Sequence, residues 1–255
     1  MAVELIKQTY RPSLNVGQVY AAPYGAAGAA PMPIGNVLEL DLEHEEDVQT
    51  QEDMTRLGGG IHAEVRRVKA VKFKAKLVDL NVVNLTRAVL GTAQAVAGAS
   101  VVDEPHVAAR GGLLRVAHIQ PTAVTLKKGA TASSATAVTP AGNFEVRPEG
   151  VFVFPEAADI LDGDLLWLSY TYGGYASIEA LTTKAVELAL TFGGLNEADS
   201  GKPVVVDVFR CSQGVTKSLA MLGKNFGALD VGGSVLMDPT RQGAGLSRYY
   251  KMSFV

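Results

Sequence analysis

The sequence has 255 residues, of which 47% are hydrophobic and 19% charged, so it can bury a core and is neither a disordered nor a collagen-like chain. Its formal net charge of −3 argues against a protein that holds DNA through an overall basic surface. A single cysteine, Cys211, excludes an intrachain disulfide and fits assembly in a reducing cytoplasm.

The N-terminal region predicts an arm outside the folded core. Its first residues, MAVELIKQTYRPS, lack the uninterrupted apolar stretch of a signal peptide. No apolar run in the chain approaches the ~18 residues of a transmembrane helix, so we expect no membrane anchor. Residues 16–36 are rich in Ala, Gly and Pro, which favours an extended segment without regular structure. It is either a loose leader or an arm on a neighbouring subunit, and its large apolar side chains favour docking: Tyr20, Tyr24, Met32 and Ile34.

Two strands are predicted on either side of a polar segment. Residues 37–46 alternate leucines with acids, and VKAVKFKAKLVDL, residues 68–80, alternates apolar residues with lysines, so each strand buries one face. The phase of the second strand shifts at Ala70 and Val71, which predicts a β-bulge near 70–71. If the strands pair antiparallel, acids and lysines share the other face and partly neutralise each other. The residues of that face are Glu39, Asp41, Glu43, Glu45, Lys72, Lys74 and Lys76.

The remaining elements are mostly strands. Residues 81–91 predict one short helix, with Asn81 as its cap and Gly91 at its end. Residues 101–172 carry short strand-like runs broken by turn motifs, which predicts a β-rich insertion. Residues 186–192 alternate again, and further strands follow to the C-terminus. The predicted core positions are Leu38, Leu40, Leu42, Val71, Phe73, Leu77, Leu188, Leu190 and Phe192.

No motif indicates catalysis or a cofactor. The sequence has no GxGxxG, GxxxxGK[ST], HExxH or GxSxG. The acids of residues 39–45 are better explained as one solvated strand face than as paired catalytic carboxylates, and His44 has no second histidine at ligand spacing. Trp167 falls on the opposite strand face from Tyr170 and Tyr172, so these aromatic residues do not form one sugar-stacking surface. We therefore expect no enzyme, no catalytic residue, no metal site and no cofactor.

Two blocks of sequence occur in a characteristic order. The first is GNVLELDLEHEEDVQTQEDMTRLGGG followed by VRRVKAVKFKAKLVDLNVVNLTRAVLG, and the second is KPVVVDVFRCSQGV followed by LGKNFGALDVGGSVLMDPT and SRYYK. In order and spacing they resemble the tail tube (major tail) proteins of long-tailed bacteriophages of the siphophage type. The resemblance covers roughly residues 35–91 and 176–255. Residues 101–172 are similar to the extra β-rich region that some members carry between the two halves.

The resemblance implies a mainly β fold, a tail-tube β-sandwich with one flanking helix. Its parts would be an arm over 1–36, a core over 37–100 and 173–255, and an insertion over 101–172. Six subunits would form a ring, and stacked rings a hollow tube that conducts viral DNA into the host cell. Ring closure would also cover exposed strand edges, because a closed barrel has none.

The resemblance also implies roles for the charged face and for the polar segment. The seven charged residues of 39–76 would be candidates for lining the lumen. The segment 47–62 would be a long loop that contacts the adjacent ring through Gln49, Gln51, Glu52, Asp53, Met54, Arg56, Gly58, Gly59 and Gly60.

The implied partners are further copies of the chain, a tape measure protein during assembly, the tail terminator and distal tail proteins, and double-stranded DNA in transit without sequence-specific binding. The implied location is the virion tail, assembled in the bacterial cytoplasm. One alternative is the inner tube of a contractile tail or secretion system. An alternative of another class is a β-sandwich adhesin or carbohydrate-binding module.

Overall fold

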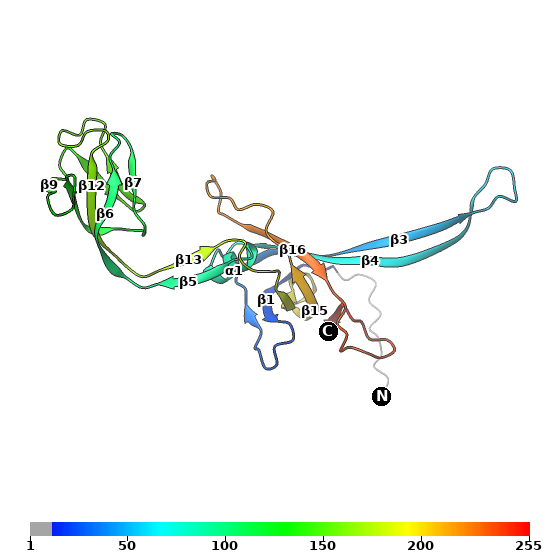
Figure 1. Cartoon of the computed structure of the whole chain (residues 1–255). Helices are drawn as coiled ribbons and strands as arrows, with labels where there is room; N and C mark the ends of the chain where they lie inside the picture. Colours follow the sequence, from blue (N-terminus) through cyan, green and yellow to red (C-terminus); the bar gives the residue numbers. More distant parts are fainter. Residues whose placement is uncertain (1–11) are drawn as a thin grey trace. The chain divides into compact units, whose positions relative to one another are not determined.

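The computed structural model describes residues 12–255, which divide into two compact units (Figure 1). Unit 1 combines the chain up to Ala93 with Ile178–Val255, and unit 2 is Gln94–Ser177. Strands make up 52% of the structure and helices 4%, which confirms the predicted mainly β fold class. The boundary of unit 2 lies outside the predicted insertion limits of 101 and 172. A two-stranded sheet of β5 (Thr92–Val96) and β13 (Tyr175–Glu179) lies at this boundary.

Unit 1 is built on one eight-stranded sheet in the order β2-β1-β14-β15-β16-β4-β3, with β17 paired to β15. β15 is antiparallel to β14 on one side, and on its other side it pairs with β17 at Val204–Val208 and with β16 at Cys211–Gln213. One strand edge therefore serves two partners. The strands are β1 (Asn15–Pro23), β2 (Met32–Pro33), β3 (Val37–Glu52), β4 (Ile61–Leu77), β14 (Glu187–Asn196), β15 (Lys202–Gln213), β16 (Leu229–Val235) and β17 (Tyr250–Phe254).

The N-terminal segment is part of the sheet, so the prediction that 16–36 has no regular element was wrong. β1 pairs with β14 over nine residues. Two β1 residues, Val19 and Ala21, are buried. Glycine makes this pairing possible, because a Cβ on Gly17 would lie 2.3 Å from the carbonyl oxygen of Gly193. The partner strand is about 170 residues away in sequence, so the composition of 16–36 alone could not reveal it. The predictions for residues 1–11 lie outside the described residues.

The segment 47–62 is not one long loop, which corrects that prediction. β3 continues to Glu52 and β4 begins at Ile61, so only 53–60 connect them (Figure 1). Gln49, Gln51 and Glu52 are therefore strand residues. Alternation is absent here because both faces of this part of the hairpin are exposed. Without a buried face, a strand has no reason to alternate polar and apolar residues.

Of the nine predicted core positions, five are buried, three are half-buried and one is exposed. Val71, Phe73, Leu77, Leu188 and Leu190 are each at most 6% exposed. Leu40, Leu42 and Phe192 are half-buried at the margin of the core. Leu38 is 60% exposed, so its assignment to the core was wrong. The register of β3 shifts between Val37 and Glu39, and this irregularity takes Leu38 out of the alternation.

The predicted helix is α1 (Val82–Ala88), and Asn81 caps it by accepting a hydrogen bond from the Asn84 backbone N–H at 2.9 Å. The Asn84 side chain is buried and donates to the carbonyls of Ile34 and Asp79. The helix ends before Gly91, because Leu90 takes the left-handed conformation with φ of 47°. Ala88 is fully buried and fixes α1 against the sheet core formed by Ala75, Leu77, Leu229 and Val231.

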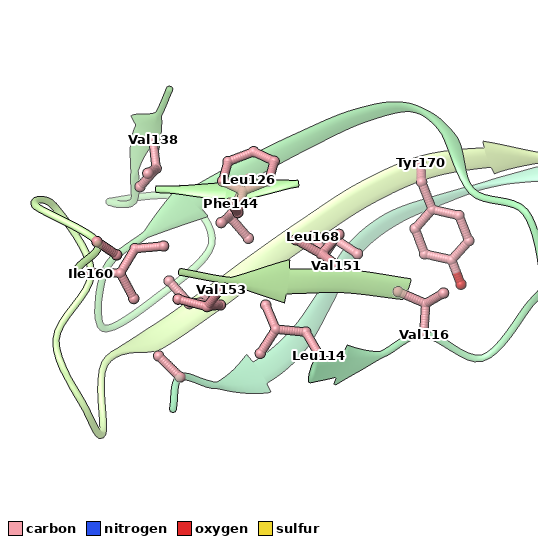
Figure 2. Packing of buried hydrophobic residues seen from close by; sticks show 13 residues of the cluster. Leu114, Val116, Leu126, Val138, Phe144, Val151, Val153, Ile160, Leu168 and Tyr170 are labelled. Atoms are coloured by element: carbon pink, nitrogen blue, oxygen red, sulfur yellow. The ribbon is translucent and has the colours of Figure 1, made fainter. Parts of the chain in front are cut away.

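Unit 2 has its own core between a three-stranded and a four-stranded sheet (Figure 2). The first sheet has the order β10-β11-β7 and the second β6-β12-β8-β9. The core between them consists only of unit 2 residues, and Val151, Val153, Ile160, Leu166 and Leu168 in it are fully buried. The strands are β6 (Ala99–Val107), β7 (Leu113–Arg115), β8 (Thr122–Lys128), β9 (Thr136–Val138), β10 (Phe144–Arg147), β11 (Gly150–Val153) and β12 (Leu165–Tyr172).

Candidate functional site

The predicted charged face lies on the paired strands β3 and β4. Their antiparallel register sets Glu39 opposite Lys76, Asp41 opposite Lys74 and Glu43 opposite Lys72. On the other side of β4, Asp230 of β16 also lies opposite Lys76. The lysine row therefore runs between acids of β3 on one side and Asp230, Gly232 and Ser234 of β16 on the other. The structure brings all seven predicted charged residues to one face, and it does not test whether that face lines a lumen.

Ion pairs on this face run diagonally across the two strands. Lys72 bonds to Glu45, and Lys74 bonds to Glu43. The hydrogen bond from Lys72 lowers the pKa of the Glu45 carboxyl, and the hydrogen bond to Glu43 raises the pKa of the Lys74 ammonium. Both shifts favour the charged forms of Glu45 and Lys74. This face is a hydrated wall of mixed charge rather than a bare basic stripe.

A β-bulge interrupts the hairpin close to the predicted position. Glu45 lies opposite Ala70 and Glu46 opposite Val68, so Lys69 has no partner in the register. The prediction of a bulge near 70–71 is confirmed to within about one residue. The bulge marks a change in surroundings, because Val71 is buried whereas all residues of β4 before Ala70 are exposed.

Beyond the bulge, residues 46–68 form a two-stranded hairpin with both faces in solvent (Figure 1). A two-stranded hairpin without a core to pack on is marginally stable in water. This one nevertheless presents a series of large apolar side chains. They are Val48 (43% exposed), Met54 (82%), Leu57 (107%), Ile61 (64%), Val65 (51%) and Val68 (56%).

The tip of the hairpin has a defined conformation. The Asp53 backbone N–H donates to the Gly60 carbonyl at 2.7 Å, and the Asp53 carboxylate accepts from both the backbone and the hydroxyl of Thr55. These bonds from Thr55 lower the pKa of the Asp53 carboxyl. Gly58, Gly59 and Gly60 all have positive φ, between 64° and 149°, which other residues rarely adopt. The three glycines therefore allow the chain to turn at the hairpin tip. Their position before a strand had predicted such a structural role.

A hydrogen-bonded cluster in unit 2 was missed by the sequence analysis. Glu104 accepts hydrogen bonds from the Tyr170 hydroxyl at 2.7 Å, from His106 at 3.0 Å and from the Ala117 backbone N–H. His118 stacks on Tyr172 with ring centroids 3.7 Å apart and bonds to the Tyr170 hydroxyl. Burial, followed by the bond to Glu104, raises the pKa of Tyr170. These residues come from β6, β12 and the segment after β7, which the fold brings together. No local sequence pattern could therefore predict the cluster.

Trp167 has a structural partner of its own in unit 2. Its indole Nε1 donates to the Gly129 carbonyl at 2.9 Å, and the residue is half-buried. In the part of the chain that the structure describes, no group of three or more His, Cys, Asp or Glu residues is arranged to hold a metal ion. Among the same residues, no helix is long and apolar enough to cross a membrane.

Cys211 is fully buried in the core of unit 1, and its thiol donates to the Leu188 carbonyl at 3.2 Å. Burial raises the pKa of this thiol to about 12. Arg210 points elsewhere and makes a two-point ion pair with Glu187, with both N–O distances at 2.8 Å. The neighbouring guanidinium therefore does not activate the thiol.

We expect Cys211 to resist alkylation in the native protein. A rise in pKa from 9.0 to about 12 lowers the thiolate fraction at pH 8 by about 1,000-fold, and the thiolate is the reactive form. Iodoacetamide at pH 8 should leave the native chain unlabelled by mass spectrometry and should label it in 6 M guanidinium chloride, used here as a denatured control. Rapid labelling of the native protein would show that Cys211 is accessible.

Comparison with known proteins gives one family match. A family model described as "Protein of unknown function UCP028589" matches residues 12–253. The chain belongs to this family. The matched range of UCP028589 includes both compact units, the hairpin and the charged face. No curated protein matches the chain.

Proposed function

We propose that this chain is a structural subunit of a phage tail tube, in which hexameric rings stack into a hollow conduit for viral DNA. The observation that carries the proposal is the hairpin 46–68, whose two faces are exposed along its whole length. The hairpin exposes large apolar side chains on both faces without a core of its own, which is a feature of a segment that packs on another chain. In a stack of rings, neighbouring copies would cover this surface.

The free strand edges of unit 1 support the same proposal. β3 is the last strand on one side of the eight-stranded sheet and runs for 16 residues, far longer than the two-residue β2 at the other end. A long exposed edge strand invites pairing with another chain unless it is protected. Lateral contacts in a ring would protect it, and a heterologous contact repeated by rotation closes a ring.

The charged face is suited to the wall of a DNA conduit. Bare lysines repeated around a channel would bind phosphates and slow a passing genome, because each phosphate contact releases counterions. Here Lys74 forms an ion pair with Glu43, and Lys72 forms one with Glu45. Such a wall would carry DNA without sequence-specific binding. It would also contact a tape measure protein during assembly, and terminator and distal tail proteins would meet the ends of the tube.

Electron microscopy of the purified protein tests the proposal. Negatively stained samples at high protein concentration should show rings or tubes about 100 Å wide, from the size of six packed subunits. Persistent monomers under all assembly conditions would refute it. A sheath gene next to this one would instead favour the inner tube of a contractile tail.

A further inference from the structure

The two ion pairs between β3 and β4 leave their lysines within reach of solvent. Lys72 bonds to Glu45, and Lys74 bonds to Glu43. All four side chains are between 42% and 59% exposed, so an external anion can approach either ammonium group. Exposed pairs of this kind add little to the stability of a fold. The main effect of the two acids is therefore on the charge that this face presents to a ligand.

The acids decide the sign of that charge. The seven charged residues of the face comprise four acids and three lysines, which gives a net charge of −1. Without the carboxylates of Glu43 and Glu45 the face would carry +1, because three lysines would then face two acids. Glu45 also acts on Lys69 at the bulge: the bond from Lys72 lowers the pKa of the Glu45 carboxyl, and the charge of Lys69 contributes to the same shift. Loss of both carboxylates would thus uncover three neighbouring cations, Lys69, Lys72 and Lys74.

Double-stranded DNA is the anion that such a row of lysines would bind. Lysines on one strand face bind phosphates through charge, without reading the base sequence. In this chain, a phosphate that approached Lys72 or Lys74 would have to displace the carboxylate already bonded there. The displaced carboxylate would stay close to the phosphate and repel it, because both carry negative charge. The carboxylate also belongs to the same chain as the lysine, so it loses no translational freedom on bonding.

We infer that Glu43 and Glu45 prevent this face from binding double-stranded DNA, and that the lysine row becomes a DNA-binding surface when both carboxylates are removed. The two acids are then specificity-determining residues, which exclude a ligand that the lysines alone would hold. The inference rests on the proposed function, because it names the residues that would let DNA pass this face without adhering. It extends that function, since the DNA affinity of the face can be measured on the free subunit.

The double variant Glu43→Gln with Glu45→Gln tests the inference. Each substitution removes a charge and keeps the size and polarity of the side chain, and circular dichroism checks that the variant folds as the wild type does. Binding of a fluorescein-labelled DNA duplex is followed by fluorescence anisotropy at increasing salt. We expect the variant to bind at least about tenfold more tightly than the wild type at low salt. The slope of the logarithm of its association constant against the logarithm of salt concentration should be steeper by roughly 2–3, because each phosphate contact adds about 0.9.

A matched control separates the effect of this face from the effect of net charge. Glu156→Gln with Glu197→Gln makes the same change in net charge at two exposed positions outside β3 and β4. We expect this control to bind DNA as weakly as the wild type. Equal gains in the two double variants would attribute the gain to net charge and overturn the inference. The absence of a gain from Glu43→Gln with Glu45→Gln would overturn it as well.

Removal of the lysines provides the reverse test. Adding Lys72→Gln and Lys74→Gln to the first double variant should return the DNA affinity and the salt dependence close to the wild-type values. Gained binding that survives this change would place the DNA elsewhere on the chain and overturn the inference.

Electron microscopy of the wild type separates this inference from the tube proposal. Tubes of the wild type together with unchanged DNA affinity in the first double variant would overturn the inference alone. The expected gain in affinity, without rings or tubes under any assembly condition, would uphold the role of the two acids and contradict the tube function. Absence of both results would contradict both.

Discussion

Shortening the hairpin should abolish tube formation and leave the subunit folded. In the variant, residues 48–66 are replaced by an Asn-Gly turn that joins Asp47 to Arg67, which lie opposite each other in the register. The removed residues contribute nothing to either core of unit 1. We therefore expect the free energy of unfolding to change by only about 1 kcal/mol, whereas electron microscopy should show no tubes.

Point substitutions separate hairpin contacts from hairpin length. Leu57→Thr removes the most exposed side chain of the tip and should shorten the tubes or slow their growth. Leu161→Thr, at a 53% exposed position in unit 2, should leave the tubes normal. Tubes of normal length from the shortened variant would contradict the role of the hairpin. Unfolding of that variant would show that the hairpin stabilises the subunit itself.

Phe73→Ala should lower the free energy of unfolding of unit 1 by about 3–5 kcal/mol. The ring is 3% exposed and packs in the core with Val71, Leu188 and Leu190. It also covers Gly233, where a Cβ would lie 3.0 Å from the ring, so the loss of the ring leaves a cavity over bare backbone. Urea unfolding followed by far-ultraviolet circular dichroism measures the change.

The chain offers a control for that measurement in each unit. Lys74→Ala changes the next residue of β4, whose side chain is 59% exposed, and should shift the transition by about 0.5 kcal/mol or less. Trp167 is the only tryptophan and lies in unit 2, so its fluorescence reports on the other core. We expect Phe73→Ala to leave the Trp167 transition unchanged. An unchanged circular dichroism transition in Phe73→Ala would mean that the buried face of β4 is misassigned.

Sequence patterns predicted those parts of the fold in which one face of an element is buried. Val71, Phe73 and Leu77 alternate with lysines because they face a core, and the break in that alternation located the bulge. Asn81 revealed the start of the helix because capping is a local interaction. The sequence also predicted that acids of β3 and lysines of β4 share one face. Each of these strands buries one face, so its charged residues occupy the alternate positions that face solvent.

The parts that escaped prediction depend on long-range pairing or lack a buried face. β1 is a strand because β14 accepts it, through glycines that allow close approach at Gly17 and Gly194. The outer hairpin has no alternation because neither face is buried. Leu38 follows the pattern of its neighbours, but a register shift removes it from the core. The Glu104 cluster arises from several segments at once, which no local window of sequence contains.

The pairing of β1 with β14 has a consequence for the order in which the chain folds during synthesis. Tyr20 lies opposite Thr191, so the first strand emerges from the ribosome about 170 residues before its partner. At roughly 5–20 residues per second, this delay is on the order of 10–35 s. Unit 2 is complete at Ser177 and can fold during that interval, whereas unit 1 must wait for β14, β15 and finally β17 at the C-terminus. The eight-stranded sheet, in which β17 pairs with β15, is therefore completed only after Tyr250–Phe254 have been synthesised.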